Sequence, residues 1–233
     1  MKIICLGDSL MQENGPETYP QEGWPQELHY FLQNPLIPVL DLALNGRSTK
    51  SYIDEGHFAE ALEKAQEGDV VFISFGHNDE KKEDPKRYTD PYGSYQSNLA
   101  LMNGKFQEKG CKVFFFTSMT RLHYDEKGVL LHTHGDYPQA MKEVAKRLGV
   151  TCFDLEKLSY DFLAPSSFET NCGYYMKPNS TGRSIFFEAN FTTSRERNPE
   201  VSGIKDATLI SFGSMVFIWA SRFMRSNRPG PHL

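Results

Sequence analysis

Five short apolar runs, separated by helical patterns, place the strongest constraint on the fold of this 233-residue chain. The runs read KIICLG, IPVLDLAL, DVVFISFG, CKVFFFTS and VTCFDL. Because they are almost unbroken in hydrophobicity, we expect strands that are buried on both faces, and their alternation with helices favours a parallel sheet. The sequence therefore predicts an α/β fold, a three-layer α/β/α sandwich whose parallel sheet has about five strands.

Helical patterns occupy the segments between the runs. Apolar residues recur at spacings of three to four in the segments 23–34, 57–68, 97–110 and 137–150, several of which end in Gly. No internal repeat or long low-complexity linker interrupts the chain, so we expect one domain over residues 1–223. The part from about residue 177 is atypical, and residues 224–233 are expected to form a tail.

Composition and charge exclude several classes of partner. The net charge is -5, without a sustained Lys/Arg cluster, which argues against nucleic acid. No apolar run approaches the roughly 18 residues of a membrane span, and no separate apolar leader precedes the first run. The four cysteines lack a C-x-x-C pair, so we expect reduced thiols, neither disulfide nor metal site, and a cytoplasmic location.

Small or polar clusters follow the first three apolar runs. They read GDS at residues 7–9, NGRS at 45–48 and GHND at 76–79. Ligands bind beyond the carboxyl ends of the strands in open parallel sheets. We therefore expect the three clusters to converge at one edge of the sheet and to form the functional site there.

These clusters hold the parts that acyl transfer requires. Ser9 lies in a tight turn after a strand, where a nucleophile is exposed, although a serine hydroxyl needs a base. The backbone N–H groups of Ser9 and Gly46 and the side-chain amide of Asn78 are candidate donors to a developing oxyanion. Singly, each residue is explained as well by ordinary turn chemistry, including an Asx turn at Asn78-Asp79. The three clusters together favour the catalytic interpretation.

The combination resembles the SGNH (GDSL) hydrolase superfamily, in particular its rhamnogalacturonan acetylesterase-like branch. The segments that carry the resemblance are GDSL, ALNGRSTKSYIDEGHF, DVVFISFGHNDEKK and HGDYPQAMKEVAKRLGVTCFDL, and it extends from Met1 to about Tyr175. The resemblance implies a flavodoxin-like sandwich without metal or organic cofactor. It also implies deacylation of an O-acylated sugar, a small-molecule or oligosaccharide ester, by a Ser-His-Asp triad, with acetyl removal from a pectin-like saccharide as the narrower expectation. Ser9 would be the nucleophile, and Ser9, Gly46 and Asn78 would form the oxyanion hole.

The last block of the pattern, Asp-x-x-His, is incomplete here. KDATLISFG places Asp206 in the acid position and Leu209 in the histidine position. An isobutyl group cannot accept a proton, so catalytic activity stays open. Three explanations compete: a pseudoenzyme that binds an acylated sugar or another small ligand, a histidine from elsewhere that replaces the base, and an altered C-terminal reading such as a frameshift.

Three further residues are candidates for substrate binding. His77 lies beside Asn78, and Arg47 follows Gly46, where with Lys50 it would meet an acidic sugar such as a galacturonate. For His134 the resemblance implies a position near the substrate mouth, because the branch often has a histidine in that loop. A solvated role for the two cations has equal weight. The alternative of a flavodoxin-like nucleotide or flavin binder is disfavoured, because GDSLMQENG lacks the G-x-G-x-x-G spacing.

Packing and solvation explain other conspicuous residues. The spacing of Trp24 with Leu28 favours core or rim packing over stacking on a sugar. Asp136 is expected to cap a helix. The charged stretch 79–87, DEKKEDPKR, is mixed in sign and is expected to form a solvated loop or a helix start.

Overall fold

The computed structural model describes residues 1–18, 22–30, 32 and 34–172. These residues form a sheet of five parallel strands in the order β2-β1-β3-β4-β5. The strands are β1 (Ile3–Gly7), β2 (Val39–Asp41), β3 (Val70–Ser74), β4 (Lys112–Phe116) and β5 (Thr151–Phe153). Each lies within one of the five apolar runs, so the predicted parallel sheet is confirmed.

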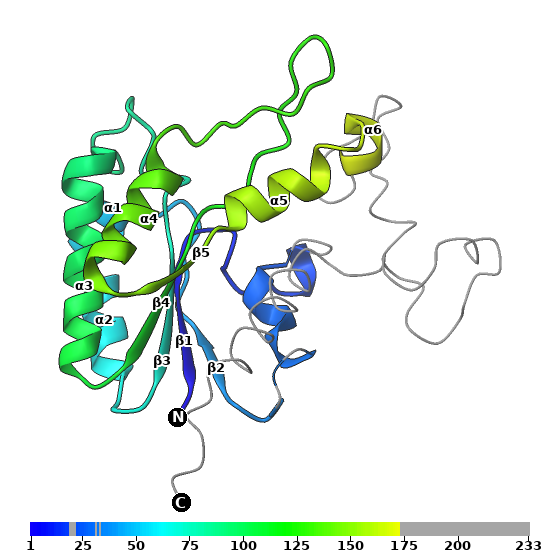
Figure 1. Ribbon diagram of the computed structural model, residues 1–233. Helices are drawn as coiled ribbons and strands as arrows, with labels where there is room; N and C mark the ends of the chain where they lie inside the picture. The colour runs from blue at the N-terminus through cyan, green and yellow to red at the C-terminus, as the bar shows by residue number, and fades with distance from the viewer. Residues whose placement is uncertain (19–21, 31, 33, 173–233) are drawn as a thin grey trace, which may run out of the picture.

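Helices cover the sheet on both sides (Figure 1). Helices α1 (Thr49–Asp54), α2 (His57–Lys64), α3 (Gln96–Glu108) and α4 (Tyr137–Leu148) pack on one face, and the 3₁₀ helix η2 (Trp24–Tyr30) lies on the other. The remaining elements of the described chain are η1 (Pro16–Thr18), the π-helical turn η3 (Pro91–Tyr95), α5 (Leu155–Leu163) and α6 (Phe168–Asn171). The arrangement is the predicted α/β/α sandwich.

The side chains of β1 show why both faces are covered. Ile4 and Leu6 are fully buried against the helices α1 to α4, whereas Ile3 and Cys5 face the side of η2. This alternation is the two-residue period of a strand, and an apolar residue at every position therefore requires a layer on each side. Trp24 of η2 is 5% exposed and packs on Phe72 of β3, so its predicted role in packing is confirmed.

Two local predictions differ from the structure. The helix predicted over 23–34 is the short 3₁₀ helix η2, where the side chain of Gln26 is committed to the backbone of Gly23 and Asn14. Asp136 occupies the cap position of α4, but its side chain makes no capping hydrogen bond. Its backbone is helical (φ -85°, ψ -6°), whereas a capping side chain requires an extended residue.

The predicted domain end at residue 223, the atypical part from about 177 and the tail at 224–233 lie outside the described residues. In the described part of the chain, no helix has both the length and the apolar character needed to cross a membrane.

Candidate active site

Hydrogen bonds join the segments that follow β1 and β2. The backbone N–H of Leu44 donates to the carbonyl oxygen of Gly7 (3.0 Å), and that of Asn45 donates to Oε1 of Gln12. The chain after β2 therefore runs beside β1 to the end of that strand. Gly46 and the Ser9 turn consequently lie at the same edge of the sheet.

The Ser9 turn is shaped by the backbone and side chain of Asp8. The Asp8 carbonyl accepts from the N–H groups of Met11 and Gln12 (both 3.1 Å), and its Oδ1 accepts from that of Leu10 (3.0 Å). Ser9 itself is half-buried, and its hydroxyl has no hydrogen-bond partner among the described residues. The turn thus presents Ser9 with its oxygen unengaged.

Gly7 allows the sharp exit from β1 into this turn. A Cβ on Gly7 would lie 2.5 Å from Sδ of Met11 and 2.7 Å from the carbonyl oxygen of Ser74. Neither distance is compatible with a real side chain. The glycine of the GDS cluster is therefore required for close packing of the chain around the turn.

Gly46 and Asn78 bring the ends of β2 and β3 together. Gly46 has φ +76°, the left-handed region that favours glycine. Asn78 is 2% exposed, and its Nδ2 donates to the carbonyl oxygen of Arg47 at 3.0 Å. A side-chain amide has two N–H donors, so this bond leaves one of them for another acceptor.

Asp79 anchors three segments to one another. Its buried carboxyl accepts from the backbone N–H and the Oγ1 of Thr49 at the start of α1, and from Oγ1 of Thr89 (2.8 Å). Burial raises the pKa of Asp79 to about 7, although these donors and the Thr49 backbone oppose the shift. The segment before α1, which carries Gly46, is thereby held against the segment after β3.

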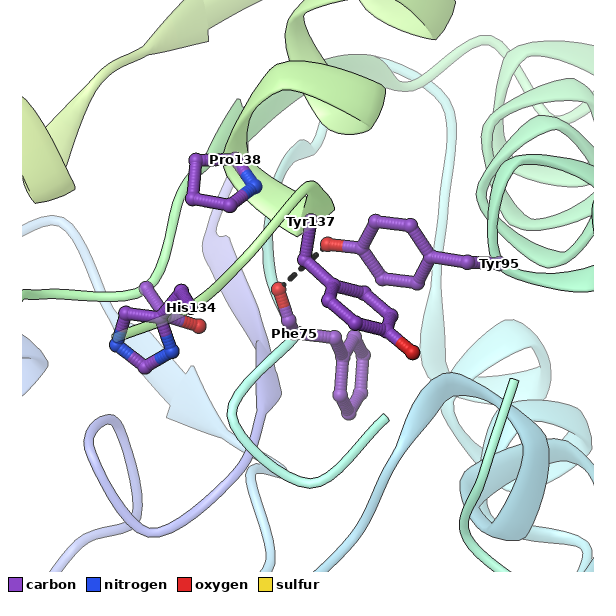
Figure 2. Close-up of a pocket in the computed structure, with 6 residues that line it drawn as sticks. Phe75, Tyr95, His134, Tyr137 and Pro138 are labelled. Atoms are coloured by element: carbon purple, nitrogen blue, oxygen red, sulfur yellow. Dashed lines mark hydrogen bonds between the residues drawn. The ribbon is translucent and has the colours of Figure 1, made fainter. Parts of the chain in front are cut away.

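The hydroxyl groups of two tyrosines form hydrogen bonds with the backbone of the segment after β3. The Tyr95 hydroxyl donates to the Phe75 carbonyl oxygen at 2.7 Å, and Figure 2 shows this bond beside Tyr137. The Tyr137 hydroxyl lies within hydrogen-bond distance of the carbonyl oxygens of both Asp79 (2.9 Å) and Thr89. The backbone on either side of Asn78 is therefore fixed by buried hydroxyl groups.

His134 and Arg121 surround Glu80 beside His77. Nε2 of His134 lies 2.7 Å from the Met119 carbonyl oxygen and its Nδ1 lies 3.3 Å from Oε2 of Glu80. Arg121 pairs with Glu80 and donates to the His77 carbonyl oxygen at 3.3 Å. His134 is 2% exposed, so its ring is committed to holding the loops together. Whether it also contacts substrate stays a prediction.

The His77 ring is half-buried, and its centroid lies 5.3 Å from that of His134. Burial, assisted by the positive charges of Arg121 and His134, lowers the pKa of His77 to about 3. The ring is therefore neutral near pH 7. Its buried Nδ1 has no hydrogen-bond partner among the described residues.

Of the other predicted site residues, Arg47 is half-exposed and already paired. Its Nε donates to Oε2 of Glu55 (2.9 Å) and its Nη1 to the Asn45 carbonyl oxygen (2.9 Å). Asp206 and Leu209 lie outside the described residues. Among the described residues no group of three His, Cys, Asp or Glu side chains is placed to hold a metal ion.

The interpretation of the stretch 79–87 as a solvated loop is wrong at its beginning. Asp79 is fully buried and Glu80 is half-buried within the network around His134. The charge of the stretch indicated exposure. The partners that allow Asp79 and Glu80 to be buried, Thr49 and Arg121, are distant in sequence and therefore could not be recognised. One sequence signal did indicate that Asp79 is buried, because Asp79 belongs to the GHND cluster and directly follows Asn78.

The same arrangement of segments has counterparts in known proteins. The GDSL-like Lipase/Acylhydrolase family matches residues 5–183, a range that contains Ser9, Gly46 and Asn78 and ends before Asp206. The chain belongs to the GDSL-like lipase/acylhydrolase family. This membership confirms the resemblance on which the sequence interpretation depends.

Two curated relatives within this family come from Bacillus subtilis. The chain is 36% identical to rhamnogalacturonan acetylesterase RhgT over 168 residues, which covers 71% of this chain and 70% of RhgT. It is also 36% identical to the protein named "Probable rhamnogalacturonan acetylesterase YesY" over 174 residues, which covers 75% of this chain and 79% of YesY. These identities support the rhamnogalacturonan acetylesterase-like branch of the GDSL family.

A solved structure with the same fold is that of the Bacillus subtilis protein YxiM. It aligns with 75% of this chain at a TM-score of 0.66 and 21% identity, while this chain spans 49% of that structure. At this identity the likeness concerns the fold alone.

Proposed function

We propose that this chain is a serine esterase scaffold that acts on O-acyl groups of a saccharide, with acetyl as the narrower assignment. The names of RhgT and YesY support both the ester class and the saccharide. A pectin-like saccharide is the corresponding substrate class. Membership of the acylhydrolase family supports ester hydrolysis as the chemistry.

In this proposal, Oγ of Ser9 attacks the carbonyl carbon of the ester. The negative charge that develops on the carbonyl oxygen is stabilised by the backbone N–H groups of Ser9 and Gly46 and by Nδ2 of Asn78. Asp206 occupies the position of the acid that orients the base. His77, Arg47 and His134 are the proposed contacts to the rest of the substrate.

The bond from Asn78 to the Arg47 carbonyl carries the proposal. It links the segments after β2 and β3 directly beside Gly46, and it uses one amide hydrogen while the second remains available for an oxyanion. Buried Asp79 reinforces the link through Thr49. Preorganised donors of this kind need no reorganisation when charge develops.

The missing base limits the proposed turnover. The base position is Leu209, and no described histidine accepts a hydrogen bond from Ser9. Loss of the serine or histidine of a triad lowers kcat by about 10⁶-fold in a comparable hydrolase. We therefore propose that catalysis by this chain is impaired. A base supplied by another histidine and an altered C-terminal reading are the competing explanations for Leu209.

The second candidate is a binding protein on the same scaffold, and Leu209 is the observation that favours it. In that case the oxyanion donors and the sugar contacts retain an acylated saccharide without cleaving it. A family member that keeps Ser9, Gly46 and Asn78 without a base fits this function. The two candidates share a ligand and differ in turnover.

Acetylated pectin oligosaccharides separate the two candidates. Acetate release is measured together with the ligand-dependent shift of the thermal unfolding temperature. Acetate release above that of the Ser9→Ala variant supports an active esterase in which another group replaces the missing base. A saturable thermal shift without release supports the binding protein, and the absence of both rejects the saccharide ester as ligand.

A further inference from the structure

Arg87 lies over the glycine that is proposed for the oxyanion hole. A Cβ on Gly46 would have one neighbour within 4 Å, Nη1 of Arg87 at 3.9 Å. Gly46 has no side chain of its own, so nothing on that residue separates the guanidinium from its backbone. A cation from the stretch 79–87 thus reaches the edge of the sheet where Ser9 lies.

The guanidinium is held from one side and open on the other. Its Nε donates to Oδ2 of Asp84 (2.5 Å), and the side chain is 31% exposed. Within the described part of the chain, neither Nη1 nor Nη2 of Arg87 has a hydrogen-bond acceptor. The four N–H donors on these two nitrogens form the fork that binds a carboxylate in bidentate geometry.

The position of Arg87 relative to Gly46 is set by buried contacts. Thr89, two residues beyond Arg87, donates its backbone N–H to the Asp79 carbonyl oxygen (3.0 Å) and its Oγ1 hydrogen to the Asp79 carboxyl (2.8 Å). The same Asp79 carboxyl holds Thr49, three residues beyond Gly46. One buried group therefore anchors both loops, and a fixed cation binds a ligand at a lower entropic cost than a mobile one.

Three of the neighbouring cations, Arg47, Lys50 and Arg121, are more fully engaged. Arg47 uses Nε and Nη1 on Glu55 and on the Asn45 carbonyl, and Lys50 pairs with Asp54 (2.7 Å). Arg121 pairs with Glu80. Arg87, with two terminal nitrogens open, is better prepared than these groups to bind an anion.

We propose that Arg87 is a specificity-determining residue that binds the carboxylate of an acidic sugar adjacent to the acylated one. The proposal rests on the proposed function for the location of the ester at Ser9, and it assigns the recognition of the acidic sugar to Arg87. A planar guanidinium suits a planar carboxylate, whereas a neutral saccharide leaves the fork unpaired.

The test measures binding of an ester-free ligand, so it does not depend on catalysis. Affinity for a galacturonate oligosaccharide is determined by calorimetry for the native chain, Arg87→Gln and Arg87→Lys. Lys105→Gln, which removes an exposed cation on α3, is the control for net charge. The Asp84 pair is partly exposed and contributes little to stability, so Arg87→Gln is expected to fold, which thermal unfolding checks.

We expect Arg87→Gln to weaken binding about tenfold to a hundredfold, since a charged hydrogen-bond pair is lost. Arg87→Lys retains the charge without the fork and is expected to bind with intermediate affinity. Lys105→Gln is expected to bind with the affinity of the native chain. Equal affinities of Arg87→Gln and the native chain, an equal loss in Lys105→Gln, or no binding by the native chain would overturn the assignment. Because the ligand carries no ester, failure of Ser9 chemistry leaves this result unchanged.

Discussion

Nδ2 of Asn78 donates to the carbonyl oxygen of Arg47 at 3.0 Å, across 31 residues of sequence. This bond joins the segments after two neighbouring strands at the point where Gly46 turns. The amide therefore serves the fold and the proposed oxyanion hole with its two hydrogens. The two roles can be measured separately, because loss of the bond to the Arg47 carbonyl oxygen lowers the free energy of unfolding.

Truncation of Asn78 tests its role in the fold. We expect Asn78→Ala to lower the free energy of unfolding by about 1–2 kcal/mol, since a buried hydrogen bond is lost. Urea denaturation measures the change. Asn78→Asp, whose carboxylate cannot donate, is expected to lose at least as much. An unchanged urea midpoint in Asn78→Ala would contradict the bond.

Glycine replacement distinguishes conformational strain from steric overlap. Gly46→Ala is expected to cost about 1–2 kcal/mol, because φ is +76° while the space for a Cβ is open. Gly56→Ala, with φ +87° and open space between α1 and α2, is the matched control and is expected to cost the same. Gly7→Ala is expected to cost more, since a Cβ there would overlap Met11. A neutral Gly46→Ala would contradict the strained turn.

Asp79 makes stability depend on pH. Its folded pKa of about 7 lies above the ordinary value near 3.9, so the folded state holds the proton more tightly than the unfolded state. This contribution to stability is complete below about pH 4 and is lost as pH rises through 7, by at most about 1.4 kcal/mol per pH unit. Asp8 (about 6) and Asp41 (about 7) act in the same direction.

We expect Asp79→Asn to reduce the fall in unfolding free energy between pH 5 and pH 7. Urea denaturation across this range measures the slope. Asp54→Asn, which alters an exposed carboxyl on α1, is the control and is expected to leave the slope unchanged. If Asp79→Asn and the native chain fall equally, Asp79 is ionised throughout this range and the raised pKa is refuted.

The nucleophile is tested on a simple ester. We expect the chain to hydrolyse p-nitrophenyl acetate barely above the uncatalysed rate and Ser9→Ala to change this rate little, because an isobutyl group occupies the base position. Steady-state kinetics measure both, with Ser97→Ala on α3 as the control. Robust turnover that Ser9→Ala abolishes would show that another group serves as the base.

Much of the fold could be predicted from local patterns. The five strands follow from apolar runs too continuous for a one-sided sheet, and the polar clusters after the first three strands meet at one edge of the sheet, as expected. The residues that hold this edge together could not be predicted in the same way. Asp79 and Glu80 belong to a charged stretch, and their burial depends on Thr49 and Arg121, which only the folded chain brings near.

Arg87 shows the same limit. It belongs to a stretch rich in charged residues, so its sequence context does not distinguish it from a solvated cation. Its position beside Gly46 results from Asp79, which ties Thr89 and Thr49 to one carboxyl. A contact of this kind depends on three segments at once and has no sequence periodicity.

The central claim is that Ser9, Gly46 and Asn78 form an esterase centre that lacks its base. Hydrolysis of p-nitrophenyl acetate by Leu209→His tests this claim most directly. Ile210→His is the matched control, and the double variant Ser9→Ala/Leu209→His shows whether any gain in activity depends on Ser9. We predict that kcat/KM rises by about 10²-fold or more in Leu209→His alone and returns to background in the double variant. A Leu209→His variant no faster than Ile210→His, or one whose gain survives Ser9→Ala, would contradict it.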